Sequence, residues 1–183
     1  MNSFDINSFD INPFRYFSAV PTKTYLSRSN IFYAFLGDSP MSGQGHGKPV
    51  DVLDVVCKRY KDCQRCARDR HGALCFDEFV RYRYDEANDE KFCKDKPGTC
   101  DRALCECDLS FAKAHVEVSS VFTTDYHQFW STQPNGWQPE EDCLQGGHMP
   151  YIPECCGKPD GAYTLFNAEI KTCCDGVVKN DTC

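Results

Sequence analysis

The sequence predicts a mainly α-helical, disulfide-rich protein with two long helices, a short β-hairpin and a small, irregular, cystine-rich module at the C-terminus. The first observation is the cysteine content, 14 residues in a chain of 183. The second is the helical spacing of apolar residues in two separate segments. The third is a change of character after Pro139, where six cysteines follow with little periodicity. A piece that small needs cross-links to fold.

The cysteine density also indicates the compartment. So many thiols are difficult to keep reduced in the cytosol and are expected where disulfides persist, and their even number permits full pairing. Zinc binding is the alternative, but only Cys63-Gln-Arg-Cys66 has knuckle spacing, and no second knuckle follows it. We therefore expect a secreted, extracellular protein with no metal site.

The first helix is expected to begin near Pro49 and to end at about Arg68. Proline is favoured at the start of a helix, and the carboxylates of Asp51 and Asp54 suit the positive end of the helix dipole. One face of this helix follows the i, i+3, i+4, i+7 spacing: Leu53, Val56, Cys57, Tyr60, Cys63 and Gln64.

The second helix is expected to begin near Asp101 and to continue for about five turns, to judge from its apolar period. The residues with this period are Leu104, Cys107, Asp108, Phe111, Ala114, His115, Val118, Val121 and Phe122. Between the two helices, alternating side chains over residues 79–84 and the turn signal Asn88-Asp89 predict a short hairpin.

Composition divides the chain into three parts. Residues 1–29 form an N-terminal arm in which Asn-Ser-Phe-Asp-Ile occurs twice, at 2–6 and 7–11, too few copies for a solenoid. The arm is either a flexible segment or a contact segment through which the chain assembles with itself or with another protein. Residues 30–138 form the helical domain, and residues 139–183 form the cystine-rich module.

Charge and hydropathy exclude several classes of partner. The 20 basic and 27 acidic residues give a net charge of −7, which disfavours binding to nucleic acid. No segment has the ~20 apolar residues of a membrane span. Residues 1–17 lack the basic and apolar regions of a signal peptide, so we expect the true beginning of a secreted form to differ. Asn180 opens an N-glycosylation triplet, for which use and chance are equally good explanations.

The most specific pattern in the chain is Cys93-x6-Cys100-x4-Cys105-x-Cys107-Asp108, which leads into the second helix. The first helix carries Cys57-x5-Cys63 and follows Gly47-Lys-Pro-Val-Asp. Two antiparallel helices joined by cystines, after a Gly-rich loop, resemble the secreted phospholipase A2 fold over about residues 30–130.

The resemblance implies a degenerate catalytic site. In that family the first long helix reads Cys-Cys-x-x-His-Asp-x-Cys-Tyr. In this chain the His position holds Tyr60, and the position of the calcium-binding Asp holds Lys61. The Asp that orients the catalytic His is retained as Asp108, and two residues resemble the tyrosines that bond to it: Tyr82 and Tyr84.

These substitutions remove the chemistry that the family uses. The base that takes a proton from water near neutral pH is an imidazole, whereas a phenol, with a reference pKa of about 10, stays protonated there. The ammonium of Lys61 stands where a carboxylate would hold Ca²⁺, and one cation repels the other. Shifting the register by one residue places Lys61 and Asp62 at the two positions and still supplies no His. We expect no calcium cofactor.

The resemblance also implies three disulfides: Cys63–Cys107, Cys75–Cys100 and Cys93–Cys105. A fourth family cystine is missing at both ends, where Val56 and Ala114 stand. The remaining cysteines cannot be assigned from the sequence: Cys57, Cys66, Cys143, Cys155, Cys156, Cys173, Cys174 and Cys183. Adjacent cysteines do not readily bond to each other, so each is expected to reach a different partner.

The C-terminal module resembles another family. Cys155-Cys156-Gly157, followed by Cys173-Cys174-Asp175-Gly176, is similar to the di-cysteine repeats of galaxin-type matrix proteins. Such a module implies a clamp or a contact surface.

The two resemblances together favour a pseudoenzyme: an otoconin-like, non-catalytic structural or binding protein of an extracellular or mineralised matrix. Its expected partners are other matrix proteins or a mineral surface. One alternative is a secreted, calcium-dependent phospholipase A2 that hydrolyses phospholipid esters, which would need a His that the first helix lacks. The other is a non-hydrolytic, toxin-like ligand, which the net charge of −7 disfavours.

Overall fold

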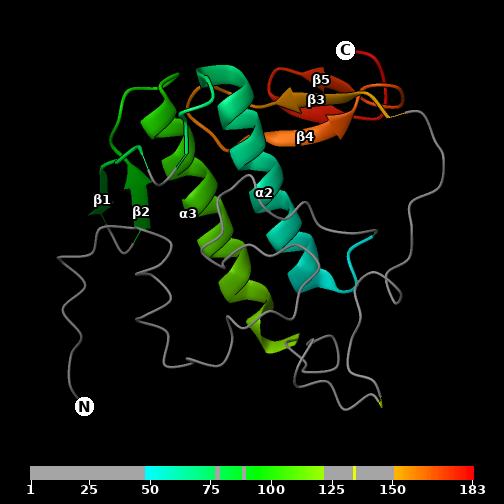
Figure 1. The fold of residues 1–183 in the computed structure, drawn as a ribbon, viewed down its shortest axis with the longest axis horizontal. Helices are drawn as coiled ribbons and strands as arrows, with labels where there is room; N and C mark the ends of the chain where they lie inside the picture. The colour runs from blue at the N-terminus through cyan, green and yellow to red at the C-terminus, as the bar shows by residue number, and fades with distance from the viewer. Residues whose placement is uncertain (1–47, 77–78, 88–89, 122–133, 135–150) are drawn as a thin grey trace.

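The computed structural model describes residues 48–76, 79–87, 90–121, 134 and 151–183. Two antiparallel helices lie side by side, with a small hairpin beside one of them and the first of two further hairpins against the other (Figure 1). The helices are α2, Val52–His71, and α3, Cys100–Val118, which continues into the 3-10 turn η1, Ser119–Val121. The predicted mainly helical, disulfide-rich fold class is confirmed. The N-terminal arm and the Gly-rich loop lie outside the described residues.

The start of α2 follows from two carboxylates. The side chain of Asp51 accepts a hydrogen bond from the backbone N–H of Asp54 at 2.7 Å, and the Asp54 side chain accepts one from Val50 at 3.1 Å. The first contact satisfies an N–H of the first turn that has no helical partner, and the second fixes the backbone just before the helix. At the other end Gly72 has φ +102°, a conformation that suits glycine. The helix ends at His71, three residues beyond the predicted end at Arg68.

The first hairpin reverses direction between Ala87 and Glu90, where the turn signal predicts it, but its first strand lies later in the chain than the side-chain alternation predicts. It pairs β1, Tyr84–Ala87, with β2, Glu90–Cys93, whereas the alternation covers residues 79–84. The difference has a physical reason, since the backbone N–H of Arg83 bonds at 2.6 Å to the buried carboxylate of Asp95. That N–H is therefore not available to a strand ladder.

The C-terminal module is more regular than its sequence suggests. It contains two antiparallel hairpins, β3, Pro153–Cys156, with β4, Thr164–Asn167, and β5, Thr172–Cys174, with β6, Val177–Lys179. The strands have only three or four residues, so their alternation is too short to be recognised by period. The turn between β5 and β6 places Asp175 at φ 49° and Gly176 at φ 79°, as expected for an Asp-Gly hairpin turn.

Six disulfides join the described residues: Cys63–Cys107, Cys66–Cys155, Cys75–Cys100, Cys93–Cys105, Cys156–Cys173 and Cys174–Cys183. Three of these pairs are the ones that the family resemblance implies. The adjacent cysteines of β3 reach different partners because neighbouring residues of a strand point to opposite faces. Cys155 reaches α2, and Cys156 reaches β5.

The C-terminal module shares the hydrophobic core of the helix pair. Tyr163 is 4% exposed and belongs to the same buried cluster as residues of α2 and α3. Its ring lies under the guanidinium of Arg70, 4.9 Å from the centroid. A backbone hydrogen bond of 2.9 Å, from Gly98 to Pro159, joins the module to the start of α3. Figure 1 shows β3 and β4 against the C-terminal half of α2.

This docking predicts a strong effect at Gly157. A methyl group there would lie 2.5 Å from Cδ1 and 3.1 Å from Cα of Tyr163, and overpacking of this kind costs about 1–3 kcal/mol. We expect Gly157→Ala to lower the free energy of unfolding by that amount in urea denaturation. The matched control is Gly161→Ala, since a methyl group at Gly161 meets nothing within 4 Å. Equal stability of the two variants would contradict the described docking.

Candidate functional site

A buried polar network lies between the two helices. The hydroxyl of Tyr60 donates a hydrogen bond to Oδ1 of Asp108 at 2.8 Å, and Nε2 of Gln64 donates one to the Tyr60 oxygen at 2.8 Å. The hydroxyl of Tyr82 donates to the second carboxylate oxygen of Asp108. Tyr60 and Gln64 lie one turn apart on α2, and Asp108 faces them from α3.

Burial makes this network significant for stability. The exposed fractions are 3% for Tyr60, 4% for Asp108 and 6% for Gln64. A buried carboxylate is costly unless hydrogen bonds compensate its lost hydration. The hydroxyls of Tyr60 and Tyr82 supply that compensation, one to each oxygen. The Tyr60 ring is held in turn by Phe111, with the ring centroids 4.7 Å apart.

The structure brings together three of the five predicted site residues: Tyr60, Tyr82 and Asp108. Lys61 follows Tyr60 on α2 and is half-buried. Tyr84 is half-buried at the first position of β1, opposite Cys93. The network contains one residue that the sequence did not assign to it, Gln64. Its place one turn after Tyr60, on the predicted buried face, is the signal that could have identified it.

Asp62, the residue that the shifted register would use, has a different environment. Its carboxylate forms an ion pair with Lys58 one turn earlier on α2. Burial raises the pKa of Asp62, and the hydrogen bond and charge of Lys58 act in the opposite direction. Asp62 therefore belongs to a helix-surface pair and not to the Tyr60–Asp108 network.

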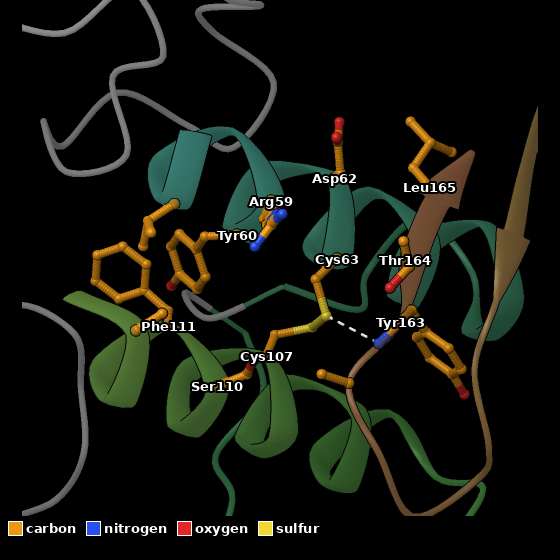
Figure 2. Close-up of a pocket in the computed structure, with 13 residues that line it drawn as sticks. Arg59, Tyr60, Asp62, Cys63, Cys107, Ser110, Phe111, Tyr163, Thr164 and Leu165 are labelled. Atoms are coloured by element: carbon orange, nitrogen blue, oxygen red, sulfur yellow. Dashed lines mark hydrogen bonds between the residues drawn. A yellow bond between two sulfur atoms is a disulfide. The ribbon is translucent and has the colours of Figure 1, made fainter. Parts of the chain in front are cut away.

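A cavity of about 370 Å³ lies beside the network. Tyr60 and Phe111 form one end, Thr164 and Leu165 lie at the other, and the Cys63–Cys107 disulfide crosses between them (Figure 2). The lining residues are Val56, Arg59, Tyr60, Asp62, Cys63, Cys107, Ser110, Phe111, Ala114, Ala162, Tyr163, Thr164 and Leu165. The sequence did not predict this cavity, because its second wall comes from β4 and the residues just before it.

A single hydrogen bond links the helix side of the cavity to its hairpin side. The backbone N–H of Tyr163 donates to Sγ of Cys63 at 3.2 Å, across a separation of 100 residues. In Figure 2 this bond is the dashed line from the disulfide to the hairpin. No periodic signal connects residues so far apart, which explains why the sequence left this contact unassigned.

The described residues contain neither a metal-binding cluster nor a membrane-spanning helix. No three His, Cys, Asp or Glu side chains in this part of the chain form a group that could hold a metal ion. None of the helices in the described ranges combines the length and the apolar composition needed to cross a bilayer.

Comparison with known proteins identifies the family. No protein-family model matches the chain. An acidic phospholipase A2 of Micrurus dumerilii is 38% identical over 96 residues, which cover 50% of this chain and 80% of that protein. The chain belongs to the phospholipase A2 family.

Two further members of the phospholipase A2 family support the assignment. The membrane-associated phospholipase A2 of Mus musculus is 27% identical over 103 residues, which cover 56% of this chain and 67% of that protein. The basic phospholipase A2 beta-bungarotoxin A1 chain of Bungarus flaviceps flaviceps is 37% identical over 68 residues, which cover 37% of this chain and 44% of that protein.

The polar network predicts a measurable stability effect in this family member. Tyr60→Phe removes the hydroxyl that donates to Asp108 and accepts from Gln64. Leaving a buried polar group without a partner costs about 1–3 kcal/mol. We therefore expect Tyr60→Phe to lower the free energy of unfolding, measured in urea, by about 1–3 kcal/mol or more. Tyr151→Phe is the control, because Tyr151 is 55% exposed. A Tyr60→Phe protein as stable as the control would refute the buried network.

Proposed function

We propose that this phospholipase A2 family member is non-catalytic and acts as an extracellular structural or binding component. The observation that carries the proposal is the hydrogen bond that the Tyr60 hydroxyl donates to Asp108 at 2.8 Å, at the position where the family resemblance implies the catalytic imidazole. In this chain Asp108 therefore accepts a hydrogen bond from a phenol. The family resemblance implies that the same residue would orient an imidazole base.

The hydrogen bonds of Tyr60 oppose a role as a general base. A base must offer a lone pair to a water molecule at about 2.6–3.2 Å. The Tyr60 oxygen already accepts from Gln64, its proton is directed to Asp108, and the residue is 3% exposed. The Tyr60 hydroxyl is thus occupied by contacts within the protein and is poorly placed to accept a proton from water. His115 does not replace it, because it lies seven residues after Asp108 on α3, about two helical turns away.

The described residues do not fit a calcium ion at the family's position. Hard cations such as Ca²⁺ are held by carboxylate and carbonyl oxygens. Lys61 brings an ammonium to the position where the resemblance implies a carboxylate, and the neighbouring Asp62 is already paired with Lys58. We therefore propose that this position has no calcium cofactor, and no step of a reaction is assigned to it.

The C-terminal module supports a contact role. Four large apolar side chains are about half exposed on it: Tyr151 at 55%, Ile152 at 49%, Ile170 at 52% and Val177 at 57%. An exposed apolar side chain is available for contact with a partner, and these four offer such surface on the module. With the di-cysteine resemblance to galaxin-type proteins, it favours an otoconin-like component of an extracellular or mineralised matrix. Asn180 is exposed and accessible to glycosylation.

Hydrolysis of mixed phospholipid vesicles is the direct test of the non-catalytic proposal. We expect the purified, oxidised protein to release no fatty acid above a protein-free control, with or without millimolar Ca²⁺, because it lacks a base at position 60. An acidic snake phospholipase A2 is the positive control. Calcium-dependent release that Asp108→Asn abolishes would restore the enzyme alternative and overturn the proposal.

The extracellular proposal predicts complete disulfide formation. Twelve of the 14 cysteines form six disulfides in the described ranges, so full pairing requires a seventh bond between Cys57 and Cys143. We expect no thiol to react with iodoacetamide under denaturing, non-reducing conditions, and a peptide map to contain the Cys57–Cys143 link. Two or more labelled thiols in the secreted protein would contradict full pairing.

A further inference from the structure

The non-catalytic role proposed above does not account for the cavity between the helices and the C-terminal hairpin. Its volume of about 370 Å³ lies in the range of small-molecule sites, about 300–1,000 Å³. Its lining includes the exposed residues Arg59, Ser110 and Thr164, so the cavity is open to the surface and a small molecule can enter it.

Small side chains at the helix crossing and the added hairpin together create the space. Val56 of α2 and Ala114 of α3 line it, and these are the positions where the family resemblance implies a missing cystine. Two short side chains leave room between the helices where a cystine would bridge them. The hairpin, fixed to α2 by Cys66–Cys155, then forms a wall along that space.

The charges at the cavity favour an anion. Arg59 and Asp62 are the charged residues of the lining. The carboxylate of Asp62 is neutralised by Lys58, whereas Arg59 has no carboxylate partner within the described part of the chain. Figure 2 shows the Arg59 nitrogen atoms between the Tyr60 end and the hairpin end of the cavity. A planar guanidinium in this position suits a carboxylate, which it can bind through two hydrogen bonds.

The rest of the lining favours an apolar body. Val56, Phe111, Ala114 and Leu165 supply apolar surface, and the disulfide Cys63–Cys107 adds more. Ser110 and Thr164 offer exposed hydroxyls for a polar end. An apolar wall with a few polar groups is the usual composition of a small-molecule site.

We propose that this cavity binds a small organic anion, a medium-chain carboxylate in chemical class, with its apolar body against Val56, Phe111 and Ala114 and its carboxylate at Arg59. The hairpin wall makes the site a property of the helix pair and the C-terminal module together. The inference does not depend on whether the protein hydrolyses phospholipids, so its failure and the failure of the non-catalytic proposal are distinguishable.

Isothermal titration with sodium octanoate, below its micelle concentration, tests the proposal on the full oxidised protein. We expect a single site with a dissociation constant of about 1 mM or lower, since small ligands can gain this much from a preformed site. Octylammonium and octanol are the comparison ligands, and we expect each to bind at least tenfold more weakly. Octanoate binding no stronger than that of octanol would overturn the role of Arg59.

Two variants locate the site. Arg59→Gln is expected to weaken octanoate binding about tenfold by removing one charge-assisted contact, whereas the matched control Arg65→Gln, an exposed residue of α2 outside the cavity, is expected to change it less than twofold. Ala114→Leu is expected to remove binding by filling the space while the circular dichroism spectrum is unchanged. Equal effects of the two arginine variants, or full binding by a folded Ala114→Leu protein, would place the ligand elsewhere and refute the proposal.

Discussion

The Cys63–Cys107 disulfide is the constraint on which the rest of the site depends. It fixes the register of α2 against α3 near the middle of both helices, because the two cysteines are covalently joined. Residues at fixed offsets from it are then placed as well. Tyr60, one turn before Cys63, meets Asp108, the residue after Cys107, at hydrogen-bond distance. The same disulfide crosses the cavity and accepts the N–H of Tyr163.

The Tyr60–Asp108 network gives a structural role to residues that the family resemblance places at the catalytic position. Asp108 would be a buried, costly charge if its partners were removed. The phenols of Tyr60 and Tyr82 satisfy both of its oxygens, and the amide of Gln64 completes the contacts of Tyr60. The phenol of Tyr60 supports the proposed loss of catalysis, and it leaves no buried carboxylate oxygen of Asp108 without a donor. These hydrogen bonds give Asp108 a role in the stability of the helix pair.

The sequence predicted the parts of the structure that have a local periodic pattern. Apolar period gave both helices, and the Asp51 and Asp54 carboxylates marked the start of the first. The turn signal Asn88-Asp89 falls between the two strands of the first hairpin, as predicted. The side-chain alternation placed only the first strand too early, because the Asp95 carboxylate takes the backbone N–H of Arg83 and no local pattern shows this. The family resemblance brought Tyr60 and Asp108 together. The cavity wall could not be predicted, since it depends on the Cys66–Cys155 bond across 89 residues and on the Tyr163 contact with Cys63.

The Cys66–Cys155 bond also explains why the C-terminal module is part of the site and not an appendage. In the chain-entropy account, a cross-link over 89 residues stabilises the folded state by about 4 to 5 kcal/mol, less what the other disulfides already remove from the unfolded chain. The bond holds the hairpin where the buried ring of Tyr163 completes the core of the helix pair. Val56 and Ala114 stand where the family resemblance implies a cystine between the helices. The hairpin that Cys66–Cys155 joins to α2 lines the space beside these two residues. A hairpin fixed there gives the gap between the two helices a second wall, and the result is a surface-open cavity with a cationic side chain on its lining. The cavity therefore depends on both the short side chains of the helix pair and the cross-linked C-terminal module.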